Sequence, residues 1–182
     1  MDYVGTEKNR AAGRRRCLRF VLCLITSLFI IMSGCSFMNS EKVNTPERQA
    51  KAISTQMIKC FKEKDSENLK SLFSQHVQEK YDLDTQIKEA FDFINGDIVS
   101  HDEPDGKSSG KSTDMLGTIY REIQGEVTSV KTDKGKTYGI YYFACRTYRY
   151  DKDYVGVYCI LIASEDEEDS RIFIGNIDES FV

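Results

Sequence analysis

The chain has 182 residues and carries 25 Lys and Arg against 29 Asp and Glu. If the first 34 residues are removed as a targeting segment, they take six basic and two acidic residues with them. The remaining 148 residues then hold 19 basic and 27 acidic side chains, a net charge of −8. A chain of this length builds one domain around one hydrophobic core, and its acidity disfavours binding to nucleic acid.

The six cysteines do not form a recognisable scaffold. Half of them precede the expected domain, and the other half lie inside it: Cys17, Cys23 and Cys35, then Cys60, Cys145 and Cys159. Three cysteines are an odd number for a disulfide framework, and the sequence has neither a C-x-x-C pair nor a cysteine–histidine cluster. We therefore predict no metal and no cofactor.

A targeting segment opens the chain. Basic residues culminate in Arg14–Arg16 and Arg19, and a thirteen-residue apolar stretch covers 20–32. As a helix this stretch would measure about 20 Å, shorter than a bilayer core of about 30 Å. The pattern predicts a signal peptide over 1–34. The alternatives are an uncleaved anchor helix and an ordinary secretory signal.

The residues Met32-Ser33-Gly34-Cys35 resemble the lipobox of bacterial lipoproteins, with Met32 in place of the usual leucine. Small residues at Ser33 and Gly34 suit a peptidase cleft. The resemblance implies cleavage before Cys35 and a diacylglyceryl group on its thiol. The protein would then be anchored by lipid on the extracytoplasmic face of the cell membrane, and residues 35–44 would form a polar tether.

The first half of the domain shows helical periodicity. Thr45 can cap a helix that has Pro46 at its first position and that ends near Lys64. A short second helix is predicted over 66–73. A third begins near Asp82 and ends at Asn95-Gly96.

The second half changes to strand patterns, with β-branched and aromatic residues between turn signals. Residues 103–114 are rich in Gly, Ser and Lys and are predicted to be a mobile loop. The predicted strands are 97–102, 116–130, 138–149, 154–163 and 171–177.

Helices followed by strands predict an α+β fold. About three N-terminal helices would pack on a curved antiparallel sheet of four to five strands. The domain would cover 45–178, followed by a tail at 179–182. This plan resembles the cone of nuclear-transport-factor-2-like, or cystatin-like, proteins.

Three segments, 81–98, 135–138 and 155–158, resemble a family of uncharacterised lipoproteins found mainly in Firmicutes and catalogued as a domain of unknown function. The resemblance implies the cone fold and a Gram-positive setting. It brings no catalytic residues.

The strand register predicts two candidate features. If residues 151–153 form a three-residue hairpin loop, Cys145 lies opposite Cys159, either as a disulfide or as two small buried side chains. The same register directs four side chains away from the helices, as a candidate binding face or as ordinary outward strand residues: Tyr142, Arg146, Tyr148 and Tyr158.

No motif points to catalysis. The Gly106–Thr113 segment resembles a phosphate-binding loop but has three residues between its glycines instead of four. His76 and His101 are the only histidines, and a strand would direct Asp102 away from His101.

We expect a non-catalytic module that binds a small molecule or a protein. The alternatives are a cone-fold enzyme that uses a pocket acid or histidine as general base, and a passive envelope component.

Overall fold

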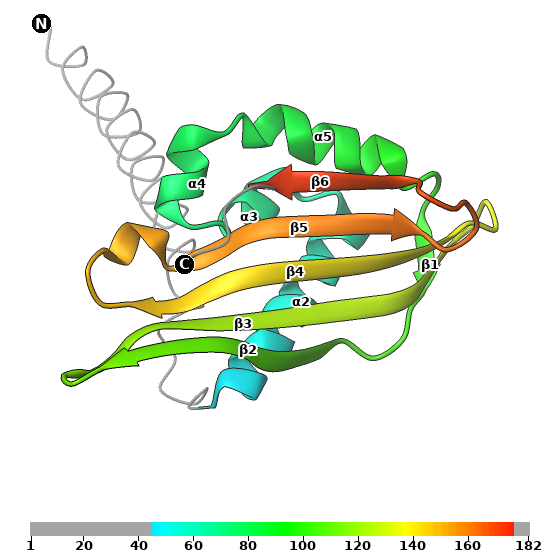
Figure 1. Cartoon of the computed structure of the whole chain (residues 1–182). Helices are drawn as coiled ribbons and strands as arrows, with labels where there is room; N and C mark the ends of the chain where they lie inside the picture. Colours follow the sequence, from blue (N-terminus) through cyan, green and yellow to red (C-terminus); the bar gives the residue numbers. More distant parts are fainter. Residues whose placement is uncertain (1–44, 177–182) are drawn as a thin grey trace, which may run out of the picture. The chain divides into compact units, whose positions relative to one another are not determined.

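The computed structural model describes residues 45–176, which form helices and one antiparallel sheet of six strands (Figure 1). The helices are α2 (Pro46–Glu63), α3 (Ser66–Lys70), α4 (Gln75–Lys80), α5 (Leu83–Phe93) and the 3-10 helix η1 (Lys152–Tyr154). The strands are β1 (Ile98–Ser100), β2 (Asp105–Asp114), β3 (Gly117–Thr132), β4 (Thr137–Tyr148), β5 (Gly156–Ser164) and β6 (Arg171–Gly175). The predicted signal peptide, lipobox, tether and tail lie outside the described residues.

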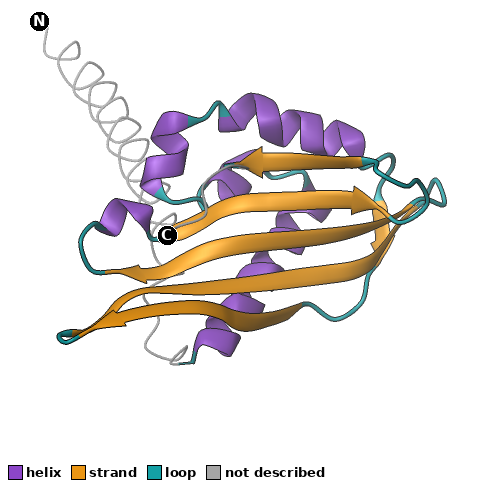
Figure 2. Cartoon of the chain, viewed as in Figure 1, coloured by secondary structure: helices purple, strands orange, loops and turns teal. Residues whose placement is uncertain are grey.

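The long strand β3 organises the sheet. The strand order is β1-β3-β4-β5-β6, and β2 also pairs with β3. Because β3 has 16 residues, its first half pairs with β2 and its second half with β1. Figure 2 shows α2 crossing one face of the sheet and α5 running beside β6, while no described helix covers the opposite face. Among residues 45–176, no helix is both long and apolar enough to cross a membrane.

Helix α2 forms as the sequence predicts. The Thr45 hydroxyl accepts a hydrogen bond from the Arg48 amide at 3.3 Å, and Pro46 occupies the first turn. The apolar stripe of Ala50, Ile53 and Met57 is buried against the sheet.

Two glycines let α2 approach the sheet closely. Gly106 of β2 lies directly opposite Gly125 of β3. A Cβ atom added to Gly106 would lie 2.5 Å from the Ala50 side chain, and one added to Gly125 would collide with the Ser54 hydroxyl. Ser54 in turn donates a hydrogen bond of 2.5 Å to the backbone oxygen of Asp105. We call this pair of glycines the glycine notch.

Tyr142 completes the contact between the helix and the sheet. This residue of β4 lies opposite Gly125 of β3 and is fully buried. Its hydroxyl donates a hydrogen bond of 2.7 Å to the Ala50 backbone oxygen. The missing side chain at Gly125 leaves the space that the ring occupies.

The predicted architecture of about three helices on four to five strands is wrong. The described residues contain six strands and four α-helices, with more residues in strands than in helices. Residues 103–114, predicted as a mobile loop, contain β2, and α4 was not predicted at all. A glycine- and serine-rich segment forms a strand here because the stretch of β3 from Gly117 to Glu126 pairs with it. Its lysines are typical of an edge strand. The cone architecture that was expected with this element count is not confirmed.

The predicted pairing of β4 with β5 is also wrong. Cys159 lies opposite Phe143, and Cys145 lies opposite Gly156. The connection contains η1 in place of a three-residue hairpin, and an irregularity between Phe143 and Ala144 shifts the register further. The predicted faces of β4 are reversed as well, since Tyr142 faces the helices, where it contacts Ala50 of α2.

The glycine notch and the Tyr142 hydroxyl make separable contributions to stability. Gly125→Ala forces a methyl group into α2 and should lower the free energy of unfolding by about 2 kcal/mol. Tyr142→Phe removes one buried hydrogen bond and should cost about 1 kcal/mol. Urea titration followed by far-UV circular dichroism measures both. Tyr141→Phe, on the opposite face, is the matched control and should change stability by less than about 0.5 kcal/mol. Equal losses for Tyr141→Phe and Tyr142→Phe would contradict this account.

Candidate functional site

The helix-free side of the sheet, the outer face, carries aromatic and charged side chains. Successive strand residues point to opposite sides, so the neighbours of buried Ile123, Gly125 and Tyr142 point outward. Its members across β2, β3, β4 and β5 include Asp105, Lys107, Glu122, Gln124, Glu126, Tyr141, Phe143 and Tyr158.

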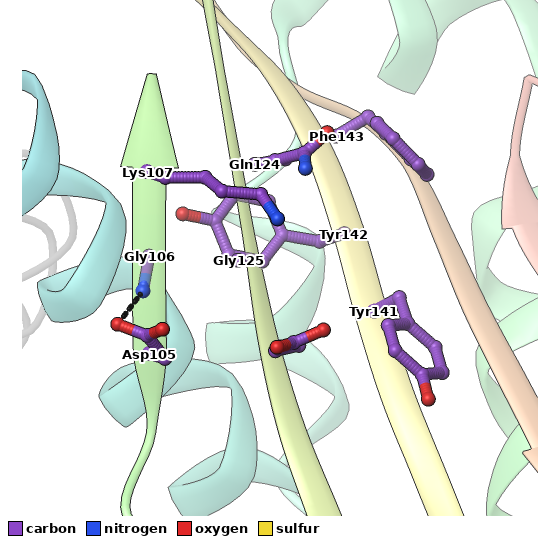
Figure 3. Close-up of a pocket in the computed structure, with 9 residues that line it drawn as sticks. Asp105, Gly106, Lys107, Gln124, Gly125, Tyr141, Tyr142 and Phe143 are labelled. Atoms are coloured by element: carbon purple, nitrogen blue, oxygen red, sulfur yellow. Dashed lines mark hydrogen bonds between the residues drawn. The ribbon is translucent and has the colours of Figure 1, made fainter. Parts of the chain in front are cut away.

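A small hollow of about 50 Å³ lies on this face above the glycine notch. Its floor is the backbone at Gly106, Gly125 and Tyr142. Six outward side chains surround it, two from each of three strands: Asp105 and Lys107, Gln124 and Glu126, Tyr141 and Phe143. Figure 3 shows Lys107, Gln124, Phe143 and Tyr141 around the opening. The volume suits one side-chain head group and is too small for a nucleotide or a sugar.

The hollow is acidic and has an aromatic wall. Partial burial raises the pKa of Tyr141, and the negative charges of Glu126 and Glu165 raise it further. The Asp105 carboxylate accepts a hydrogen bond of 2.7 Å from the Gly106 amide. The backbone of Glu126 pairs with β2 and β4. Within 45–176, its carboxylate forms no hydrogen bond or ion pair to another side chain.

A second polar contact stands beside the hollow. The Tyr158 hydroxyl donates a short hydrogen bond to the Glu122 carboxylate. Burial raises the pKa of Tyr158, and the bond to Glu122 raises it further, so this tyrosine remains protonated at neutral pH.

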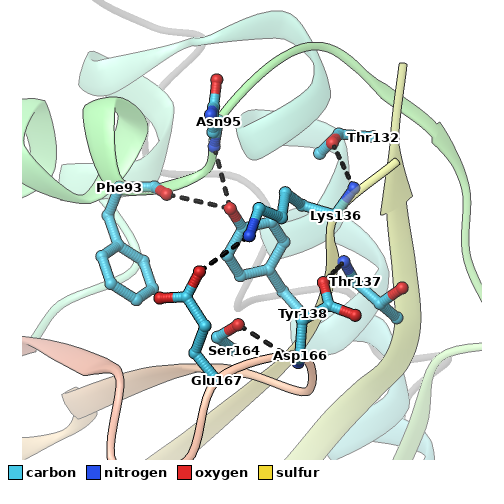
Figure 4. Close-up of polar contacts among 9 residues, drawn as sticks. All are labelled: Phe93, Asn95, Thr132, Lys136, Thr137, Tyr138, Ser164, Asp166 and Glu167. Atoms are coloured by element: carbon cyan, nitrogen blue, oxygen red, sulfur yellow. Dashed lines mark hydrogen bonds and ion pairs between the residues drawn. The ribbon is translucent and has the colours of Figure 1, made fainter. Parts of the chain in front are cut away.

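A larger hollow, about 310 Å³, lies where α5 ends beside the β5–β6 loop. Its polar groups bind one another (Figure 4). The Tyr138 hydroxyl donates to the Phe93 backbone oxygen and accepts from the Asn95 amide, both at 3.1 Å. Lys136 forms a 2.7 Å ion pair with Glu167. The Tyr138 contacts join the end of α5 to β4, and the ion pair joins the β3–β4 turn to the β5–β6 loop. We interpret this hollow as a structural joint.

The four residues of the predicted binding face do not come together. Tyr142 is buried against α2. Arg146 donates a 2.6 Å hydrogen bond to Gln49 at the start of the same helix. Tyr148 packs against other tyrosines at the end of the sheet, while Tyr158 reaches the outer face, where it is buried beside Glu122.

The candidate cysteines and histidines lie apart from the hollow. Cys60, Cys145 and Cys159 are buried free thiols, so of the two alternatives for Cys145 and Cys159 the structure has small buried side chains and no disulfide. His76 stacks on Tyr154 with ring centres 4.1 Å apart, and His101 Nδ1 lies 2.7 Å from the Asp102 backbone oxygen. Over residues 45–176, no group of three or more His, Cys, Asp and Glu is arranged to hold a metal ion.

Sequence reasoning missed the acidic hollow. The available signal was Gly125 in the middle of a long predicted strand, because a strand glycine marks close approach of another backbone. Its partner Gly106 lay in the segment assigned to a loop.

Burial raises the pKa of each of the three thiols to about 11. Because the thiolate is the reactive form, all three should react slowly in the folded protein at pH 8. We expect labelling by 5,5′-dithiobis(2-nitrobenzoate) to be at least 100-fold slower in buffer than in 6 M guanidinium chloride. Rapid labelling of one thiol in the folded protein would place that cysteine at the surface.

No curated protein matches the chain. A family model described as a domain of unknown function, DUF5104, matches residues 56–165, from within α2 to the end of β5. The match includes the glycine notch, the outer face and the β2–β3 hairpin. Because it covers more than half of the sequence, the chain belongs to the DUF5104 family.

Proposed function

We propose that this chain is a lipid-anchored extracytoplasmic lipoprotein whose domain binds a protein partner through the outer face. The anchor is argued from the sequence, since basic residues, a short apolar stretch and Met32–Cys35 follow one another in the order that lipidation requires. The binding role rests on one observation: an acidic, aromatic-walled hollow on a sheet face that no described helix covers.

The chemistry of the hollow favours a cationic side chain. Asp105 and Glu126 supply negative charge, and Tyr141 and Phe143 supply aromatic surface. An arginine or lysine head group pairs with carboxylates and packs well on aromatic rings. The net charge of −8 on residues 35–182 would attract a basic partner over longer distances.

The size of the hollow favours a protein over a metabolite. A pocket that encloses a small molecule generally measures several hundred Å³, whereas about 50 Å³ accommodates one anchoring group. A protein partner would place one basic residue here and cover the surrounding tyrosines, in the way that anchor residues are used at interfaces.

The lipid anchor is tested by Cys35→Ser. The variant lacks the thiol that accepts the lipid, so it should move from the membrane fraction to the soluble fraction or accumulate as uncleaved precursor. Cell fractionation with immunoblotting measures both outcomes. Cys23→Ser, in the apolar stretch, is the matched control and should remain membrane-bound. Unchanged membrane retention and unchanged mature size of Cys35→Ser would disprove lipidation at this residue.

The hollow is tested by Glu126→Gln, which keeps the shape of the side chain and removes its charge. Titration of the domain with N-acetyl-arginine methylamide, followed by NMR, should shift signals of Tyr141 and Gly125. The Glu126→Gln variant should bind roughly fivefold more weakly. Lys107→Gln removes a competing positive charge and should tighten binding.

The controls for this titration are the neutral citrulline analogue, which should not bind, and Glu89→Gln. Glu89 is an exposed residue of α5, so its substitution changes the net charge equally without touching the hollow. In cells, a photo-crosslinking amino acid in place of Tyr141 should give one discrete crosslinked protein, which Glu126→Gln should diminish. Equal binding of the arginine and citrulline analogues would refute cation recognition.

A further inference from the structure

The tip of the β2–β3 hairpin carries solvent-exposed apolar side chains. Met115 and Leu116 have 103% and 86% of their surface exposed, and Tyr150 nearby has 66% exposed. The tip extends past the end of β4 (Figure 1). Single exposed apolar residues are ordinary, but adjacent ones at a protruding end indicate a contact surface.

The tip is held in a defined conformation. The Asp114 carboxylate accepts a 2.8 Å hydrogen bond from the Leu116 amide, which fixes the turn. Arg149 donates to both oxygens of the same carboxylate at 2.8 and 2.9 Å and to the Thr118 backbone oxygen at 3.0 Å. The bond to Arg149, followed by that to the Leu116 amide, holds the pKa of Asp114 below its usual range. The ion pair therefore persists at neutral pH, and the apex exposes apolar groups without an unpaired charge.

Tyrosines surround the base of this tip. Tyr148 contacts Tyr150 and Tyr154 edge-on, with ring centres 5.9 and 5.6 Å apart. Tyrosine has an apolar ring and a polar hydroxyl, and it is enriched where protein meets the membrane–water interface.

The proposed lipid anchor brings this end of the domain close to a membrane. Thr45 follows Cys35 by ten residues, which span at most about 35 Å. Helix α2 starts on the same side of the molecule as the tip, because Gln49 bonds to Arg146, three residues before Arg149. A bilayer that holds Cys35 therefore lies within reach of Met115 and Leu116.

We infer that the β2–β3 tip is a second membrane contact, which places Met115 and Leu116 in the interfacial layer of the bilayer that holds Cys35. This inference rests on the proposed lipid anchor. Two contacts fix the orientation of the domain, whereas lipid on Cys35 alone leaves it free to turn.

The chain contains no tryptophan, so a single introduced tryptophan is a unique reporter. Leu116→Trp and Met115→Trp mark the tip, and Val99→Trp, at an exposed site on β1, is the matched control. Each lipidated mature protein is reconstituted into phosphatidylcholine–phosphatidylglycerol vesicles whose acyl chains carry bromine, a short-range quencher.

We expect the brominated lipids to quench the emission of both tip variants at least twofold and to leave that of Val99→Trp nearly unchanged. In unbrominated vesicles the tip variants should emit at shorter wavelength than Val99→Trp, because the bilayer interface is less polar than water. Flotation of the same vesicles tests the anchor independently. If all variants float and the tip reporters are quenched no more than Val99→Trp, the inference is wrong while the anchor stands. If the proteins do not float, the proposed anchor itself has failed.

A protein-binding tip gives a different result. The tip reporters would then remain unquenched by lipid, and a photo-crosslinker in place of Leu116 would capture a protein in cells; that combination also overturns the inference. Because these side chains are exposed, the substitutions should leave the unfolding midpoint unchanged, which confirms that the variants are folded.

Discussion

The contact between α2 and the glycine notch is the constraint on which the rest of the structure depends. A helix normally packs on a sheet through side chains, but Gly106 and Gly125 let the backbone at Ala50 approach directly. Tyr142 fills the space beside the notch and satisfies the Ala50 carbonyl. This geometry decides which face of β3 and β4 is buried, because the side chain of Tyr142, opposite Gly125, has to point toward the helix.

The same constraint shapes the outer face. Ile140, Tyr142 and Ala144 of β4 face the helix, so the alternation of strand side chains directs Tyr141 and Phe143 outward. The acidic residues of β3 that pair beside them point outward too. The hollow lies on the outer side of the notch, where the neighbours of Gly106, Gly125 and Tyr142 point outward and surround the backbone of these positions. The glycines themselves act on the other side of the sheet, where they allow the close helix contact.

Helix α2 was predictable because its signals are local. The Thr45 cap, the following proline and the stripe of Ala50, Ile53 and Met57 act within a few residues of one another. The sheet half depends on partners distant in sequence. The sequence of β2 is typical of a loop, and it is recognised as a strand only when β3 is known to be long enough to pair with it. In β4, the residues on both faces of the strand are largely apolar, so the sequence alone does not show which face is buried. The hollow was missed for the same reason, since it combines residues from three strands whose register is set by tertiary contacts.

The distance in sequence between Ala50 and Tyr142 has a consequence for the order of folding. These partners are 92 positions apart, so α2 leaves the ribosome or a translocation channel long before β4 exists to cover it. Its apolar stripe stays exposed during this interval, and the intervening strands cannot close the sheet until β4 arrives. The core of this domain therefore cannot be completed before β4 has been synthesised, however early α2 forms.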